Sequence, residues 1–240
     1  MWDTSEDYRF LVAQKSIDYF LNSVRGSKFR GKWNKNEARK IAKRMRSDLK
    51  SMQYSYMSPN DLADSEHLSS LIEKYEEIVE ILGGEDWYRK FLERSTREER
   101  DKVEESIAEI RFFLNTISGL EERLKRGKVE DPVVGVDIKV GRVMSVRDHP
   151  NADNLELCNV NISDRSLSVI TNDLRVSEDD KVAVSILPPN KLRGIVSEGM
   201  FLGADDGVLR DVKGSLGSLP QNIPLDSLNE TRSSVESFLE

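Results

Sequence analysis

The spacing of apolar residues along this chain of 240 residues changes near residue 127. Before that point, apolar residues recur at steps of three and four, which is the period of amphipathic helices. After it, they occur in short β-branched runs separated by Gly, Pro, Asn and Asp, a pattern typical of strands and turns. The pattern therefore predicts a helical N-terminal half followed by a β-rich domain.

About five helices are expected in the N-terminal half, because five segments show the helical period between recognisable start and stop signals. They cover residues 5–24, a segment capped by Asn34 or Asn36, a segment from Pro59 to the Gly83–Gly84 stop, a short segment around Trp87, and a segment that opens at Thr96. In the last one, Glu99 follows Thr96 by three residues, the spacing of a capping box.

The fifth predicted helix carries a seam of apolar residues spaced alternately by four and three. Two uses of this seam are open, a contact inside the bundle or a coiled-coil dimer. Glu121 interrupts the pattern at its next position, which favours the intramolecular contact. The seam consists of Val103, Ile107, Ile110, Leu114 and Ile117.

The β-rich part is expected to contain strands at about residues 133–146, 155–162, 167–170, 181–187 and 200–202, and a sixth at 208–209. Turn residues separate them at His149–Asn151, Ser163–Asp164 and Leu187–Asn190. Five short strands with no long helix between them predict a small closed barrel, because closure removes exposed sheet edges.

The predicted fold class is α+β with several domains. An all-α helical bundle occupies residues 1–126, and a linker follows at 127–132, where a glycine stop precedes Pro132. A five-stranded barrel occupies 133–210. The tail, 211–240, is expected to end in a short C-terminal helix opened by Ser227 and Glu230 as a capping box.

Composition indicates a folded, soluble chain, with a net charge of −7, 33% charged residues and 38% hydrophobic residues. No apolar run approaches the roughly 18 residues needed to cross a bilayer, and the acidic N-terminus lacks a signal-peptide pattern. A single cysteine, Cys158, excludes an internal disulfide. We therefore expect a cytoplasmic protein with no membrane partner.

Enzymatic signatures are absent: the sequence contains no phosphate loop, nucleophile elbow or H-E-x-x-H motif. His149 and Asp153 are four residues apart, but a third metal ligand is missing. We expect no catalysis, no cofactor and no metal site.

Positive charge is concentrated between Arg25 and Lys50, where eleven basic residues face two acidic ones in a chain that is acidic overall. Phe29 and Trp33 lie among them. A basic surface with aromatic residues suits phosphate attraction and base stacking.

An alternative for this segment is neutralisation inside the bundle. Residues 61–86 hold nine acidic residues and one lysine, so the two helices could pair their charges. Both interpretations stay open. If the segment binds nucleic acid, its contact residues are Arg39, Lys43 and Arg46.

Four segments of the β-rich part occur in a characteristic order: VGRV at 140–143, HPNADNL at 149–155, ITN at 170–172 and KLRGIVSEGM at 191–200. Together they resemble the tRNA-binding domain of the oligonucleotide/oligosaccharide-binding (OB) barrel type. That family occurs in methionyl-tRNA synthetase C-terminal extensions, phenylalanyl-tRNA synthetase β subunits and endothelial-monocyte-activating polypeptide-like proteins. The resemblance covers residues 133–205 and does not extend to the helical part.

The resemblance implies a protein that binds structured tRNA without sequence specificity and assists aminoacyl-tRNA synthetases or other tRNA enzymes in trans. A homodimer is also implied. The positions that match the family's RNA-contacting face are Asn172, Lys191, Arg193, Ser197 and Met200. For Gly194, Gly199 and Met200, a role in barrel closure and core packing is an alternative of equal weight to RNA contact. His149 is expected to hold the turn between the first two strands. A rival function is an assembly module that docks on a synthetase with little RNA contact.

The barrel departs from the family in its charge and its aromatic content. Asn154 stands where the family often has Lys, and residues 133–210 carry nine basic and twelve acidic residues. Phe201 is the only aromatic residue in that span, so base stacking contributes little. The barrel alone should bind weakly, and we expect the basic helix to be a second RNA-contacting surface on the same face of the molecule.

Overall fold

The computed structural model describes residues 4–25, 33–84 and 86–240. Its contacts divide the chain into two compact units, the first ending at Gly135 and the second running from Val136 to Phe238. The two units differ in class: the first is helical and the second is built on β-strands. The fold is therefore α+β.

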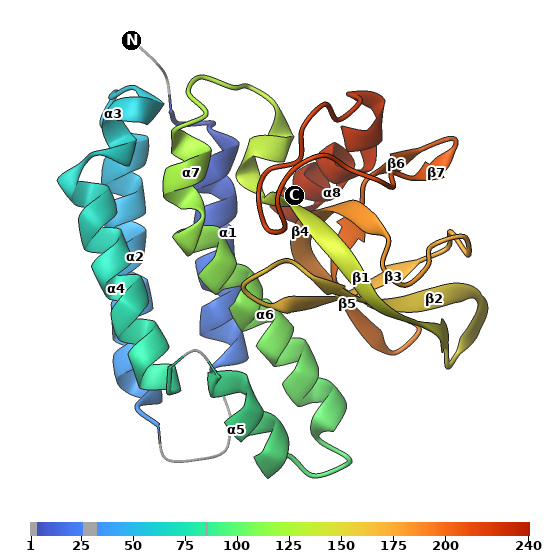
Figure 1. The fold of residues 1–240 in the computed structure, drawn as a ribbon. Coiled ribbons are helices and arrows are strands. Elements are labelled where there is room, and N and C mark those ends of the chain that lie inside the picture. Colours follow the sequence, from blue (N-terminus) through green and yellow to red (C-terminus); the bar gives the residue numbers. More distant parts are fainter. Residues whose placement is uncertain (1–3, 26–32, 85) are drawn as a thin grey trace. The chain divides into compact units, whose positions relative to one another are not determined.

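The helical unit contains seven α-helices within the described residues (Figure 1). They are α1 (Tyr8–Ser23), α2 (Lys35–Gln53), α3 (Pro59–Ala63), α4 (Glu66–Leu82), α5 (Trp87–Arg94), α6 (Arg100–Ser118) and α7 (Leu120–Leu124). The side chain of Asn34 caps α2 as predicted, and Gly83 ends α4 in the left-handed conformation.

Two details of the predicted helices need correction. The segment from Pro59 to Gly83 forms two helices instead of one. The side chain of Ser58 caps α3, and that of Ser65 caps a second helix, α4. Thr96 is not the cap of α6: it bonds Glu99 through side chains at 3.1 Å, but residues 96–99 form a turn and the helix begins at Arg100.

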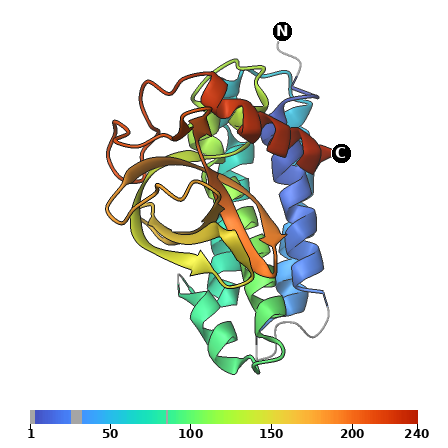
Figure 2. The ribbon, with the colours of Figure 1, turned by 90° about the vertical axis from the view of Figure 1, so that its right-hand side faces the viewer.

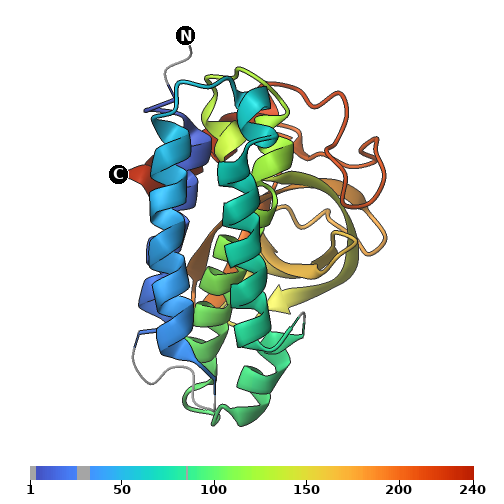
Figure 3. The same cartoon turned by 90° about the vertical axis from the view of Figure 1, so that its left-hand side faces the viewer.

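The four long helices of this unit pack in the pairs α1–α2, α2–α4, α4–α6 and α1–α6. Figure 3 shows α2 and α4 running side by side. The five seam residues of α6, from Val103 to Ile117, are all buried in this core. The intramolecular contact is confirmed. A coiled-coil dimer through this seam is contradicted, because its side chains are already buried inside the bundle.

A buried guanidinium ties the two ends of the helical unit together. Arg9 is 0% exposed and pairs with Asp7, with 2.7 Å between Nη2 and Oδ2. Its Nη1 donates to the backbone carbonyls of Arg123 and Gly127, each at 2.9 Å. The start of α1 and the segment after α7 are thereby held as one piece.

The predicted first strand starts too early. Residues Pro132–Gly135 form a short 3₁₀ helix, η1, because the Asp131 carboxylate accepts the Val133 N–H at 3.1 Å and closes a turn. This turn packs on α1: a Cβ added at Gly135 would lie 2.7 Å from the side chain of Val12.

The second unit is a closed barrel in the order β1-β2-β3-β5-β4, which Figure 2 views end-on. All neighbouring strands are antiparallel except β3 and β5. A hairpin of β6 and β7 and the helix α8, preceded by the 3₁₀ turn η2, follow the barrel. The elements are β1 (Ile138–His149), β2 (Ala152–Asn161), β3 (Ser166–Thr171), β4 (Lys181–Leu192), β5 (Ile195–Phe201), β6 (Gly203–Ala204), β7 (Gly207–Val208), η2 (Asp226–Leu228) and α8 (Asn229–Leu239).

Three details of the predicted β-rich part need correction. The expected turn at Leu187–Asn190 lies inside β4, where a register shift accommodates the two prolines that cannot donate to the ladder. The fifth strand begins at Ile195 instead of Met200. Ser227 does not cap α8, because its hydroxyl donates to the Pro224 carbonyl within a 3₁₀ turn.

Candidate nucleic-acid interface

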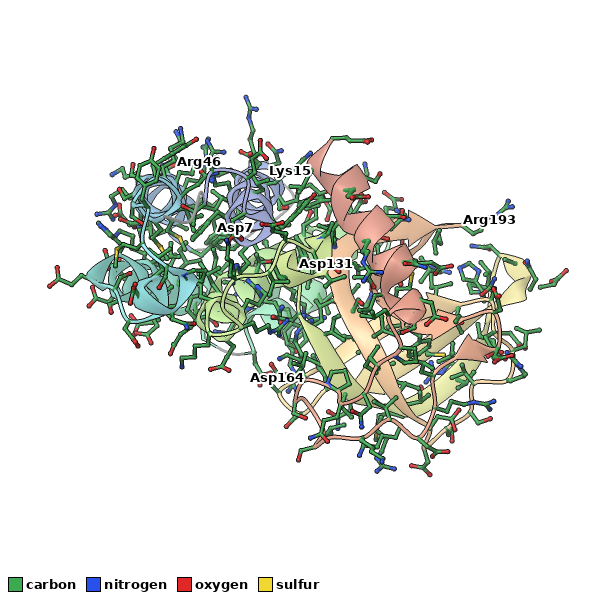
Figure 4. The ribbon with its side chains drawn as sticks, turned by 90° about the horizontal axis from the view of Figure 1, so that it is seen from above. Asp7, Lys15, Arg46, Asp131, Asp164 and Arg193 are labelled. Carbon is green, nitrogen blue, oxygen red and sulfur yellow. The ribbon has the colours of Figure 1, made fainter. Side chains whose placement is uncertain are left out.

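The hairpin between β4 and β5 presents two cations to solvent. Leu192 pairs with Ile195, so Arg193 and Gly194 form a two-residue turn. Both have positive φ, +47° and +96°, the combination that a type I′ turn requires. The side chains of Lys191 and Arg193 are exposed, and Figure 4 shows Arg193 projecting from the hairpin tip.

The turn between β1 and β2 holds this hairpin in place. The backbone N–H of Asn151 donates to His149 Nδ1 at 3.2 Å, so the ring proton lies on Nε2, which donates to the Leu192 carbonyl at 3.2 Å. The Asn151 side chain donates to the Arg193 carbonyl at 2.9 Å. His149 therefore has the structural role expected for it, and among the described residues no group of three ligating side chains could hold a metal.

Ser197 and Glu198 close the barrel along the parallel seam between β3 and β5. The backbone ladder pairs these strands only at Val169 and Gly199, and side chains supply the remaining bonds. Ser197 Oγ accepts from the Ile170 N–H at 3.1 Å and donates to the Gly199 carbonyl at 2.9 Å. Because Ser197 is only 6% exposed, its hydroxyl serves the barrel.

The next two residues of the motif, Glu198 and Gly199, also have structural roles in the barrel wall. Glu198 accepts the Ser168 N–H at 3.1 Å and binds Arg165 at 3.2 Å. A Cβ added at Gly199 would lie 2.4 Å from the backbone oxygen of Ser185, so no larger residue fits without moving the backbone. The SEG part of the motif thus has a closure role, whereas the KLRG part faces outward.

A pocket of about 630 Å³ opens beside this hairpin. Asn172 and Met200 both line it, and so does Leu192, which lies between Lys191 and Arg193 in the chain. Asn172 and Met200 thus lie together at this pocket, Lys191 and Arg193 flank its lining residue Leu192 in the chain, and Ser197 lies inside the wall. The lining residues come from the ends of β2, β3, β4 and β5, the β6–β7 hairpin, η2 and the start of α8.

The rim of the pocket is acidic, a feature that the sequence did not reveal. Asp173, Asp205, Asp226 and Glu230 line it, and no lysine or arginine is among the lining residues. Asp173 is neutralised by Arg175, whose two bonds of 2.7 and 2.9 Å lower the pKa of that carboxyl. The other three carboxylates are exposed, so the pocket repels phosphate and the hairpin is the better place for it.

The three predicted residues of the helical unit differ in their surroundings. Lys43 is exposed on α2, whereas Arg46, which Figure 4 labels, pairs with Asp18 of α1. Arg39 is half-buried, and its Nε is buried without a hydrogen-bond partner. Trp33 packs against the core with its ring 5.8 Å from that of Phe91.

Part of the predicted basic segment lies outside the described residues, namely Lys28, Phe29, Arg30 and Lys32. Whether the helical cations share a face with the barrel hairpin stays a prediction.

Charge pairing between α2 and α4 is minor. An ion pair joins them from Lys74 to Asp48 at 2.8 Å, and it takes its cation from α4 and its carboxylate from α2. Within the described ranges, Lys40, Lys43, Arg44 and Lys50 form no ion pair with a carboxylate of α4. Close ion pairing with α4 therefore does not account for the positions of these four cations.

Comparisons with known proteins divide the chain in a similar way. Residues 1–127 match a family model described as "Alpha helical domain", and residues 138–226 match one described as "Putative tRNA binding domain". The resemblance predicted for the barrel is confirmed, and the match extends into the tail. No described helix is both long enough and apolar enough to span a bilayer.

Three relatives show how the matched region is distributed. The chain is 37% identical over 97 residues to a methionine–tRNA ligase of Thermococcus onnurineus, covering 36% of this chain and 13% of the ligase. It is 32% identical over 117 residues to the putative tRNA-binding protein YtpR of Bacillus subtilis, covering 43% and 58%. It is 31% identical over 100 residues to a phenylalanine–tRNA ligase β subunit of Syntrophus aciditrophicus, covering 37% and 12%. The matched region thus spans less than two thirds of each relative.

Proposed function

Because the chain belongs to the "Alpha helical domain" family and joins that domain to a tRNA-binding domain, we propose that it binds structured tRNA without sequence specificity and has no catalytic activity of its own. The observation that carries this proposal is the outward-facing hairpin of Lys191 and Arg193, held by the HPNAD turn within the matched region. In this proposal the barrel predicted at 133–210, whose first strand begins at Ile138, is of the OB type and follows the linker predicted at 127–132.

Contacts from such a hairpin would be made to phosphates, because two exposed cations at a rigid turn offer charge without reading a base edge. Stacking contributes little, since Phe201 is buried in the barrel. Recognition then depends on the shape of a folded RNA, which is how structured RNA is bound when bases are not splayed onto aromatic residues.

Action in trans is suggested by the range of relatives. The matched region is a small part of two ligases but more than half of a protein named as a putative tRNA-binding protein. Joined to a helical domain, the same region would bring tRNA to a synthetase as a separate molecule, in the cytoplasm and as a homodimer.

The test is the affinity of the full chain for tRNA, measured by fluorescence anisotropy over a range of salt concentrations. The logarithm of the association constant should fall with log salt by about 0.7 to 0.9 per neutralised phosphate. Reversing charge with Lys191→Glu and Arg193→Glu should weaken binding. Reversal at Lys213, an exposed cation of the same unit, is the control. Equal affinity for the hairpin variant and this control would contradict the proposal.

A second candidate function, docking on a synthetase with little RNA contact, is favoured by the acidic pocket. Its apolar floor and carboxylate rim suit a basic, partly apolar protein segment, and Leu225 beside the rim is 74% exposed. This function predicts that Asp226→Lys abolishes binding to a purified synthetase while salt-dependent tRNA binding is absent from the unmodified protein.

A further inference from the structure

Helix α2 carries a stripe of cations on its solvent side. Lys40, Lys43, Arg44 and Lys50 are all exposed, and their spacing places them on one face of the helix. The opposite face is fully buried and holds the helix in the bundle through Ile41, Met45 and Leu49, among other side chains. The cations are therefore not required for packing.

Local carboxylates neutralise this stripe only in part. Glu37 lies between two of the cations, 3.4 Å from Lys40 and 3.8 Å from Arg44. Lys43 and Lys50 form no ion pair within the part of the chain that the structure describes. Four cations and one carboxylate leave a net charge of about three, and such exposed pairs are weak enough to exchange partners.

The stripe differs from the three residues expected from the sequence. Only Lys43 belongs to both sets, because Arg39 and Arg46 are half-buried, Arg46 beside Asp18 of α1. From Lys40 to Lys50 the helix rises about 15 Å, a length along which a nucleic-acid duplex presents several phosphates.

We propose that Lys40, Lys43, Arg44 and Lys50 form a second phosphate-binding surface, whose partner is the sugar–phosphate backbone of folded RNA. This inference rests on the proposed function. The hairpin of the barrel offers two exposed cations beside an acidic pocket, and a cationic face on α2 would add to their electrostatic attraction for RNA. Lysine suits this task because its ammonium binds phosphate as a point charge and reads no sequence.

The experiment compares two full-length variants that lose the same number of charges. The first carries Lys40→Gln, Lys43→Gln and Lys50→Gln. The matched control carries Arg94→Gln, Arg97→Gln and Lys102→Gln, three exposed cations elsewhere in the helical unit. Because net charge changes equally, any difference between the two reports the position of the charges on the molecule.

For the α2 variant, the slope of log affinity against log salt should become shallower by about 2 to 3, since each phosphate contributes about 0.7 to 0.9. At 0.1 M salt each lost contact lowers affinity by about five- to eightfold. The control should keep the slope of the unmodified protein. In parallel, bound tRNA should protect Lys43 and Lys50, but not Lys102, from an amine-modifying reagent read by mass spectrometry.

The outcomes separate this inference from the function on which it rests. If the α2 variant and the control behave alike while the Lys191 and Arg193 reversal weakens binding, the second surface is refuted and the proposed function stands. If the unmodified protein shows no salt-dependent tRNA binding, the proposed function fails and the inference fails with it. Circular dichroism of each variant confirms that the helices are intact.

Discussion

Replacing Ser197 with alanine distinguishes a structural role for this residue from an RNA contact. The substitution leaves the Ile170 N–H without its acceptor at 3.1 Å and the Gly199 carbonyl without its donor at 2.9 Å. Both groups lie on the parallel seam, where the backbone ladder pairs only one pair of residues. A buried N–H without an acceptor costs about 1 to 3 kcal/mol, whereas a carbonyl that loses one donor keeps a second lone pair and costs less. We therefore expect the barrel to lose about 1 to 3 kcal/mol of stability.

Cys158 provides an assay that reports on the barrel alone. It is the only cysteine of the chain and lies in the barrel core with 0% exposure. Burial, with Glu156 nearby, raises the pKa of its thiol to about 12, so it is unreactive in the folded state. When opening and closing are fast relative to modification, the rate of modification follows the open population. Since 1.4 kcal/mol is a factor of ten, Ser197→Ala should speed labelling by about 5- to 150-fold.

The affinity of the folded variant for tRNA should be unchanged, because the hydroxyl does not reach the surface. Ser166→Ala, at an exposed position of β3, is the control and should leave the labelling rate unchanged. The reasoning is refuted if Ser197→Ala labels as slowly as the unmodified protein while tRNA affinity falls.

Three further predictions concern other parts of the chain. Arg9→Met leaves the Asp7 carboxylate buried without its partner, so the helical unit should lose about 3 to 5 kcal/mol, measured by urea unfolding followed through tryptophan fluorescence. Arg193→Gly removes a non-glycine residue from a left-handed turn, which should stabilise the barrel by about 1 kcal/mol in the Cys158 assay while tRNA affinity falls. Burial and neighbouring carboxylates raise the pKa of Glu156. The folded state therefore holds this proton more tightly, and stability falls as pH rises from the unfolded pKa through the folded one. Glu156→Gln should stabilise the barrel at neutral pH and give no gain at low pH, by urea unfolding followed with circular dichroism; a gain independent of pH would contradict this.

Local patterns predicted those parts of the fold that depend on neighbours in sequence. The apolar period of α2 and its Asn34 cap lie within a few turns of chain, so both could be found without tertiary information. The errors occurred where a single hydrogen bond redirects the backbone, as at Asp131 before η1, or where a register shift absorbs prolines inside β4. In both places the path of the backbone depends on one hydrogen bond or one register shift, which the residue composition of the segment does not predict.

In the candidate site, too, some features could be predicted from the sequence and others depend on tertiary contacts. Lys191 and Arg193 were predicted from the resemblance of their motif to a family, whereas the hairpin turn at Arg193 and Gly194 that exposes their side chains was found only in the structure. The structural role of Ser197 was hidden, since its partner Ile170 belongs to a strand that becomes adjacent only when the barrel closes.

By itself, then, the sequence determined the two classes of unit and the basic character of α2, because each arises from residues close together in the chain. Tertiary structure alone decided which cations of α2 face solvent, since Arg46 meets a carboxylate of another helix. It also decided the acidic rim, where Asp205 and Glu230 meet only after the tail returns to the barrel. Electrostatic fields and burial depend on distance in space, and the chain order does not contain that distance.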